Sequence, residues 1–123
     1  MSTFPPQLVD AERPVWMLSA NHHDRGKVWV LTLTGESDLA SRDLLARELE
    51  TAENRHRERL VLDVSRLRFC DAASVELILG AARRTWVGMT GATASVARVF
   101  ELLDPDGIVH AVSPHGWPQG DPA

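Results

Sequence analysis

The segment LVLDVSRLRFCDAASV, from Leu60 to Val75, contains two adjacent patterns that decide the fold. Residues 60–64 are apolar and β-branched, which is typical of a buried central strand, and we expect this strand to run parallel to an earlier one. Asp71 then has the residue type and the position of a helix N-cap. Apolar residues recur after it at helical spacing: Val75, Ile78, Leu79, Ala82 and Trp86. The segment therefore predicts a strand followed by a helix that ends near Met89.

Upstream of this segment, the sequence predicts two strands joined by a turn, and then a helix. Residues 15–20 and 27–34 form apolar or alternating runs, and residues 21–26 between them supply turn chemistry. After an interruption at residues 35–38, Ser41 suits the N-cap of an amphipathic helix. The apolar face of that helix consists of Leu45, Leu49 and Ala52.

Downstream, the pattern predicts a fourth, weak strand at residues 92–97, a short helix at 98–103, a turn at 104–107 and a last extended piece at 108–112. Strands that alternate with helices indicate the α/β class. We expect a small mixed sheet of four to five strands, packed by two main helices and a short C-terminal helix.

Length and composition fit one globular domain. The chain has 123 residues, of which 44% are hydrophobic and 24% are charged, as in ordinary soluble proteins. We expect the domain at residues 14–112, between an N-terminal tail at 1–13 and a disordered C-terminal tail at 113–123. The formal net charge of −4 argues against a nucleic-acid partner.

Cysteine usage and apolar patterning bear on the compartment. Cys70 is the only cysteine in the sequence, which excludes an internal disulfide and a multi-thiolate metal site and fits a reducing environment. The first residues do not resemble a signal peptide, and no apolar run approaches the roughly 20 residues that span a bilayer. We therefore expect a cytoplasmic protein without a membrane partner.

The order and spacing of these segments resemble the STAS domain of bacterial anti-sigma factor antagonists, the SpoIIAA-like fold. The resemblance covers residues 28–112 and depends on the order and spacing of the segments more than on any single motif. These segments are Gly35-Glu36-Ser37-Asp38-Leu39, a helix, the strand Leu60-Val61-Leu62-Asp63-Val64, and Phe69-Cys70-Asp71-Ala72-Ala73-Ser74-Val75 at the start of a second helix. The resemblance implies a regulatory, non-enzymatic role in partner switching. In such systems the unmodified antagonist docks on a GHKL-type, kinase-like anti-sigma factor and frees the sigma factor, and phosphorylation by that kinase ends the docking.

The resemblance also indicates where the phosphate is normally attached. In the family, an Asp is followed by two small residues, often Ser-Ser or Ala-Ser, and then by Gly, and the first Ser is the acceptor. The corresponding residues here are Ala72, Ala73 and Ser74, so the usual acceptor hydroxyl is absent. A phosphate at this position adds about −1.5 to −2 charges beside Asp71 and, in the family's geometry, near Asp38. Ala72 stays uncharged, which leads to the hypothesis of a constitutive binder.

The predicted partner-binding residues are Asp38, Ser41, Asp71, Ala72, Ala73 and Ser74. Ser74 is a weak candidate for phosphorylation, because two positions along a helix rotate a side chain by about 200°, away from residue 72. We expect it instead to be a helix-start serine whose hydroxyl bonds to the backbone at the cap. Two roles are open for Asp71, a cap that contributes about 1 kcal/mol and a residue that shapes the partner site, and both can hold. Asp38 is either a solvated loop aspartate or a contact residue.

Other reactive residues lack the neighbours that catalysis or metal binding requires. His22 and His23 are adjacent in a predicted turn, without an acidic or thiol ligand at metal spacing, so we expect them to be solvated. We expect Cys70 to be an inert core thiol. The sequence contains neither a nucleophile elbow nor a phosphate-binding loop. We therefore expect no metal, no cofactor and no enzymatic activity.

Two alternatives stay open beside the docking module. One is a scaffold subunit of a larger STAS assembly, and the other is a sensor that binds a small ligand or a nucleotide. A sensor predicts a sizeable apolar cavity with converging polar groups, whereas a docking module predicts a shallow face around Asp38 and Ala72. In either case we expect a monomer or a weak homodimer.

Overall fold

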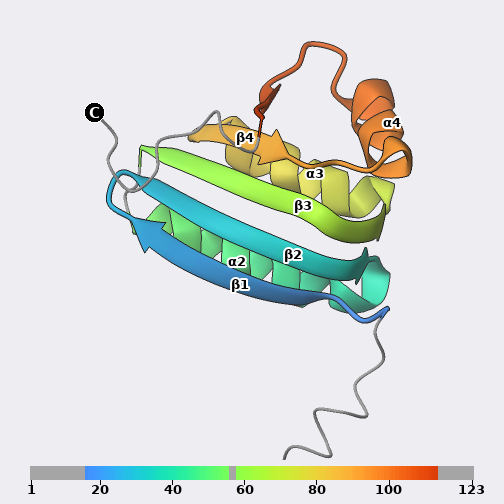
Figure 1. Cartoon of the computed structure of the whole chain (residues 1–123), viewed down its shortest axis with the longest axis horizontal. Coiled ribbons are helices and arrows are strands. Elements are labelled where there is room, and N and C mark those ends of the chain that lie inside the picture. Colours follow the sequence, from blue (N-terminus) through green and yellow to red (C-terminus); the bar gives the residue numbers. More distant parts are fainter. Residues whose placement is uncertain (1–15, 56–57, 114–123) are drawn as a thin grey trace, which may run out of the picture.

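The computed structural model describes residues 16–55 and 58–113, which form a five-stranded sheet in the order β1-β2-β3-β4-β5 (Figure 1). The strands are β1 (Ser19–Arg25), β2 (Val28–Ser37), β3 (Arg59–Cys70), β4 (Trp86–Thr90) and β5 (Val109–Ala111). β1 is antiparallel to β2, and β2 to β5 are parallel to one another. The prediction of a mixed sheet, with β3 parallel to an earlier strand, is confirmed.

The helices cover one face of this sheet. They are the 3-10 turn η1 (Leu39–Ser41), α2 (Arg42–Asn54), α3 (Ala72–Ala82) and α4 (Ala94–Leu103). In Figure 1, α2 lies behind β1 and β2, α3 lies behind β3 and β4, and α4 packs beside α3. The expected α/β class, with two main helices and a short C-terminal helix, is confirmed.

The hydrophobic core lies between the sheet and the helices. The predicted apolar face of α2 is buried at each of its residues, Leu45, Leu49 and Ala52. These side chains share one cluster with strand residues such as Leu31 and Leu62, which are completely buried. Because burying a leucine contributes about 1.5–3 kcal/mol, this layer holds β2, β3, α2 and α3 in one rigid frame.

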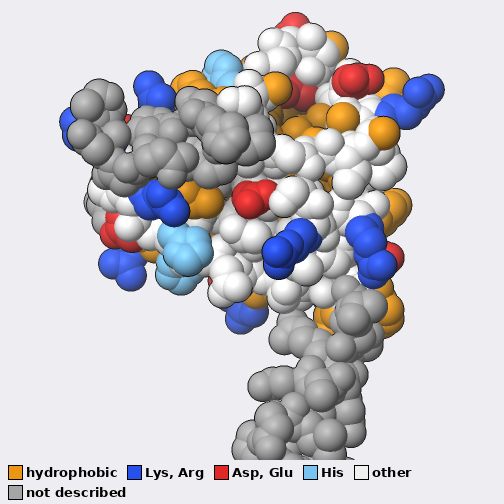
Figure 2. Space-filling view, viewed as in Figure 1, with side chains coloured by type: hydrophobic (Ala, Val, Ile, Leu, Met, Phe, Trp, Pro, Cys, Tyr) orange, Lys and Arg blue, Asp and Glu red, His pale blue; other side chains and the backbone are white. Residues whose placement is uncertain are grey.

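Within the described residues, no helix lies over the opposite face of the sheet. A small apolar cluster of Val28, Val30 and Val61 is buried there, beside the partly buried Trp86 and Val112. Figure 2 looks onto this face and shows Lys, Arg and His side chains dispersed over it. The face is therefore a mixed polar surface with a small apolar centre.

The first hairpin differs from the prediction. Residues 21–25, expected to form a turn, belong to β1, and the turn begins at Gly26, whose φ of 77° suits a tight hairpin. Tertiary contacts explain the longer strand, because the His22 ring stacks on Trp29 with the centroids 4.6 Å apart. Asp24 also accepts a hydrogen bond from the backbone N–H of Gly26 at 3.1 Å. A polar edge strand therefore stands where a loop was expected.

The helix that follows Asp71 is shorter than predicted. It ends at Ala82 rather than near Met89, and residues 86–90 form β4. Trp86 continues the helical spacing in the sequence, but its ring covers Gly88 of its own strand, where an added Cβ would come within 2.7 Å of the ring. A short apolar run does not by itself distinguish a strand from a helix.

The predicted strand at residues 92–97 is also wrong. Residues 94–97 are instead the first turn of α4, because the hydroxyl of Thr93 accepts a hydrogen bond from the backbone N–H of Val96 and caps the helix. The predicted turn at 104–107 is confirmed by the hydrogen bond from Gly107 N–H to the Asp104 carbonyl oxygen. The last extended piece is confirmed as β5.

The predicted tails at residues 1–13 and 113–123 lie outside the described residues, apart from Ser113. The domain limits of 14–112 therefore stay a prediction. Among the described residues, no helix is long and apolar enough to cross a membrane.

Candidate functional site

The two loops that carry the predicted site residues lie side by side at one end of the sheet. β2 and β3 are paired up to their last residues, where Ser37 is in register with Cys70. The backbone N–H of Asp71 donates to the carbonyl oxygen of Ser37 at 3.0 Å. β2 leads into Asp38 and β3 leads into Asp71, so η1 and the first turn of α3 are neighbours at the right-hand end of the sheet (Figure 1).

Asp71 is the N-cap of α3, as predicted. Its carboxylate accepts a hydrogen bond from the backbone N–H of Ser74 at 2.8 Å, and its own backbone is extended. Ala72 follows as the first residue of the helix and is exposed, whereas Ala73 is half-buried. The helix therefore begins with a small, uncharged side chain at the protein surface.

Ser74 lies on the inner side of the same turn. It is only 1% exposed, and its hydroxyl accepts a hydrogen bond of 2.7 Å from the hydroxyl of Ser37, which is fully buried. The expectation that Ser74 turns away from Ala72 is confirmed. The expected hydroxyl bond to the backbone is replaced by this bond across to β2, because the pairing of β2 with β3 brings Ser37 within reach.

Ser37 is a buried partner of the site that was not among the predicted site residues. One signal was present, because Ser37 continues the alternation of buried residues along β2, Leu31, Leu33 and Gly35. A hydroxyl on such a buried face needs a partner, since an unpaired buried polar group costs about 1–3 kcal/mol. The partner lies 37 residues further along the chain, beyond the range of a local pattern.

Asp38 and Ser41 form a reciprocal cap around η1. The Asp38 carboxylate accepts a hydrogen bond from the backbone N–H of Ala40 at 3.1 Å, and the Ser41 hydroxyl accepts one from the backbone N–H of Asp38 at 2.9 Å. Ser41 occupies the predicted N-cap position of α2, but among the described contacts its hydroxyl makes no bond to that helix. Its side chain closes η1 instead, so the first loop of the site is locally fixed.

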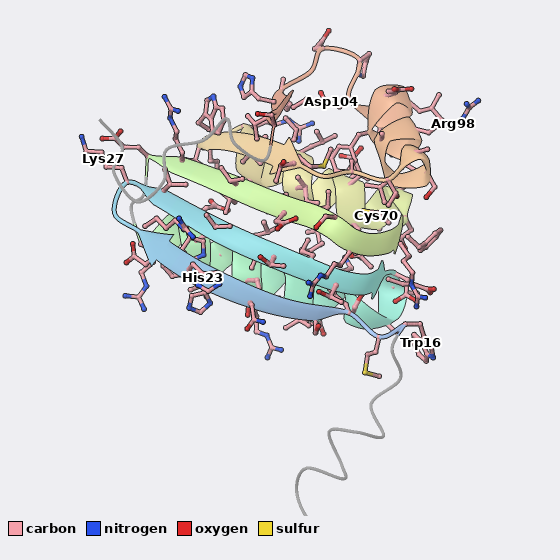
Figure 3. All side chains as sticks on the ribbon, in the orientation of Figure 1. Trp16, His23, Lys27, Cys70, Arg98 and Asp104 are labelled. Carbon is pink, nitrogen blue, oxygen red and sulfur yellow. The ribbon has the colours of Figure 1, made fainter. Side chains whose placement is uncertain are left out.

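Exposed apolar side chains surround this end of the sheet. Of the five large hydrophobic side chains that are exposed in the described part of the chain, four belong here: Trp16, Met17, Leu39 and Phe69. Glu36 of β2 connects three of these positions. Its backbone N–H donates to the Trp16 carbonyl oxygen, it forms an isolated β-bridge with Met17, and it is in register with Phe69 of β3. Figure 3 shows Trp16 at the same end of the sheet as Cys70. Exposed apolar surface of this kind marks interaction sites in soluble proteins.

Irregular strand pairing accompanies this surface. The register between β2 and β3 shifts twice, between Thr32 and Thr34 and between Gly35 and Glu36. Gly35 has a φ of 99°, and an added Cβ would come within 2.5 Å of the Met17 carbonyl oxygen. Glycine is therefore required for the chain at residues 16–17 to lie against β2. Bulges often occur beside functional sites, where they redirect side chains.

Cys70 lies directly beneath the α3 cap. The side chain is 2% exposed, and burial, together with the charge of Asp71, raises the pKa of its thiol to about 12. A thiol with this pKa stays protonated near neutral pH and is a poor nucleophile. The prediction of a buried core cysteine is confirmed.

A cavity adjoins the η1 side of the site. Its volume is about 370 Å³, and it is lined by residues from three segments: Trp16, Met17, Leu18, Asp38, Ala40, Ser41, Leu44 and Arg47. Other cavities, of about 310 and 440 Å³, lie elsewhere, one beside α4 and one between α2 and α3. Of these three cavities, the one beside η1 is lined by predicted site residues, Asp38 and Ser41.

The two adjacent histidines lie apart from this end of the sheet. Neighbouring residues on a strand point to opposite faces, and the Nδ1 atom of His22 lies 3.8 Å from the Oε1 atom of Glu48 on α2. His23 is exposed on β1 (Figure 3). Among residues 16–55 and 58–113, no three His, Cys, Asp or Glu side chains are grouped as a metal site.

Comparison with known proteins identifies the family. A family model described as "Mlab, STAS domain" matches residues 21–110, and the chain therefore belongs to the STAS domain family. No curated protein matches the sequence at a significant level.

Solved structures share the fold at low sequence identity. An anti-sigma factor antagonist from Mycobacterium paratuberculosis has a TM-score of 0.72 and 17% identity, covering 80% of this chain and 86% of that one. The unphosphorylated form of the anti-sigma factor antagonist SpoIIAA has a TM-score of 0.64 and 19% identity, with 80% and 90% coverage. A putative anti-sigma factor antagonist from Thermotoga maritima has a TM-score of 0.64 and 19% identity, with 77% and 85% coverage. The expected SpoIIAA-like fold is confirmed.

Proposed function

We propose that this chain is a regulatory protein-binding module, an anti-sigma factor antagonist that docks on a GHKL-type, kinase-like anti-sigma factor. The docking surface is the first turn of α3 together with the η1 loop. The observation that carries the proposal is the exposed Ala72 at the start of α3, beside the cap at Asp71 and at the end of the sheet that also carries exposed apolar side chains.

The proposed docking is constitutive because Ala72 has no hydroxyl. A phosphate on the first residue of α3 would add about −1.5 to −2 charges next to Asp71 and repel a partner from the surface. The serine hydroxyls of the two site loops are poor substitutes for this acceptor. Ser74 and Ser37 are buried and bonded to each other, and Ser41 is held in the η1 cap.

A surface that binds a protein explains the geometry better than a ligand sensor. A small-ligand site encloses most of its ligand in a cavity of about 300–1,000 Å³. The cavities of about 370, 310 and 440 Å³ are open to solvent and lie in separate parts of the molecule. None of them is lined by Ala72, where the resemblance to the family places the regulatory position.

The test is binding of the intact chain to purified anti-sigma kinases encoded in the same genome, with and without ATP. We expect the complex to persist with ATP and the chain to take up no phosphate. Ala72→Asp should weaken the complex at least about 100-fold, because like charges at an interface cost several kcal/mol.

The matched control is Ala94→Asp, which places the same charge on the exposed first residue of α4. This variant should bind as the wild type does, and both variants should keep the wild-type circular dichroism spectrum. Stoichiometric phosphorylation of the wild-type chain, or release of the complex by ATP, would contradict the proposal.

A further inference from the structure

The cavity beside η1 has a composition that fits a particular kind of protein segment. Its walls come from the chain before β1, from η1 and from the first two turns of α2. We call it the Trp16 pocket, after the aromatic side chain that forms one wall and is 45% exposed. Figure 3 shows Trp16 at the edge of the molecule, so the pocket opens at the surface.

The apolar part of the pocket is suited to one large side chain. Trp16, Met17 and Leu44 line it, and Trp16 and Met17 keep more than a third of their surface in contact with solvent. Apolar area gains free energy when it is removed from water. Binding energy at protein interfaces concentrates in such places, where one anchor side chain fills one pocket.

The polar part of the pocket carries one available cation. Arg47 lines the pocket and is exposed, and it forms no hydrogen bond or ion pair with the residues that the structure describes. The Asp38 carboxylate also lines the pocket, but its Oδ1 atom already accepts bonds from Ala40 N–H and from the Ser41 hydroxyl. Arg47 is therefore the group that an incoming charge would meet, and it favours a carboxylate.

We propose that the Trp16 pocket binds a segment of the partner protein in which a large apolar side chain is followed within one or two residues by Asp or Glu. The apolar side chain fills the pocket, and the carboxylate pairs with Arg47. This inference rests on the proposed docking function, because the pocket shares Asp38 and Ser41 with the docking surface. It adds the recognition chemistry of the partner.

The experiment is a selection of random peptides displayed on phage against the intact 123-residue chain, followed by calorimetric titration of synthetic copies. We expect enrichment of Leu, Ile, Met or Phe next to Asp or Glu. Trp16→Ala and Arg47→Ala should each weaken binding by about tenfold or more. Arg47→Glu should reverse the charge preference, so that the lysine version of the peptide binds more tightly than the aspartate version.

Two controls separate this inference from the proposed function. Arg42→Glu changes an exposed arginine on the same helix that does not line the pocket, and it should leave peptide affinity unchanged. Ala72→Asp should also leave peptide affinity unchanged while it abolishes binding to the anti-sigma kinase. If instead Arg47→Glu blocks the kinase and Ala72→Asp does not, the pocket stands and docking at Ala72 is wrong.

Two results would overturn the pocket proposal. One is a set of selected peptides whose affinity is the same for the wild type, Trp16→Ala and Arg47→Glu. The other is binding of a peptide that copies residues 1–15 of this chain, with the same loss in the Trp16 and Arg47 variants, because the occupant would then be the chain's own N-terminal segment.

Discussion

The first turns of α3 and α4 lie at the same end of the sheet and have similar sequences, Asp71-Ala72-Ala73-Ser74 and Thr93-Ala94-Ser95-Val96, yet they are held differently. In α3 the cap bond is 2.8 Å long and the inward hydroxyl of Ser74 is buried. In α4 the cap bond is 3.4 Å long, and the exposed Ser95 hydroxyl reaches the Arg68 carbonyl oxygen at 3.4 Å. Both cap bonds are partly buried, and the shorter one holds its backbone more firmly. The difference indicates that the start of α3 is held more firmly than the start of α4.

The largest difference between the two turns should follow from placing a carboxylate on the serine of each. Ser74→Asp buries a charge beside Asp71 and should lower the free energy of unfolding by about 3 kcal/mol or more. Ser95→Asp adds the same charge at an exposed helix N-terminus and should change it by less than about 1 kcal/mol. Urea unfolding followed by circular dichroism measures both, and equal losses would refute the distinction.

A smaller difference is expected from removing the two caps. Asp71→Ala should cost about 1–2 kcal/mol of unfolding free energy, and Thr93→Ala about 0.5 kcal/mol, because a short cap bond is stronger than a long one. The same urea titrations apply. Asp71→Ala should also weaken binding to the anti-sigma kinase, since it loosens the backbone that presents Ala72. A greater loss from Thr93→Ala would reverse the comparison.

The smallest expected difference is a dependence on pH. The residue before the α3 cap is Cys70, and burial, together with the charge of Asp71, raises the pKa of its thiol from 9.0 to about 12. The residue before the α4 cap is Ala92, which has no titratable group. The folded protein therefore retains a proton that the unfolded chain loses above about pH 9. This contribution to stability is complete below pH 9 and declines between pH 9 and 12.

The urea midpoint should accordingly fall between pH 8 and pH 10, and it should fall less in the Cys70→Ala variant. Lys27 and the other groups that titrate in this range are common to both proteins, so the comparison isolates the thiol. Equal falls in the two proteins would show that Cys70 has no part in the effect.

Features that depend on neighbouring residues could be predicted from the sequence. The cap at Asp71 depends only on a backbone N–H three residues along the chain. The buried face of α2, at Leu45, Leu49 and Ala52, follows from apolar residues repeating about every 3.6 positions. The exposure of Ala72 and the inward direction of Ser74 follow from the same helical geometry. These local signals were sufficient to place the start of α3.

Features that depend on distant contacts could not be predicted. Residues 21–25 are part of β1 because they pair with β2, where His22 stacks on Trp29. Trp86 has the apolar spacing of α3 in the sequence, but in the structure it begins the strand β4. The buried bond between Ser37 and Ser74 appears only when β2 and β3 are paired. Likewise, the position of Trp16 beside Asp38 depends on the contact of residues 16–17 with Glu36 near the end of β2, which no local pattern encodes.

Gly35 determines how residues 16–17 lie beside the end of β2, although it is itself buried. Because the Met17 carbonyl oxygen lies only 2.5 Å from where a Cβ of residue 35 would be, a single methyl group at this position would push the chain before β1 away from the end of β2. The walls of the Trp16 pocket would separate while Ala72 and its cap kept their places. The absence of one carbon atom thus sets the spacing between the two parts of the proposed docking surface, the Trp16 pocket and the start of α3.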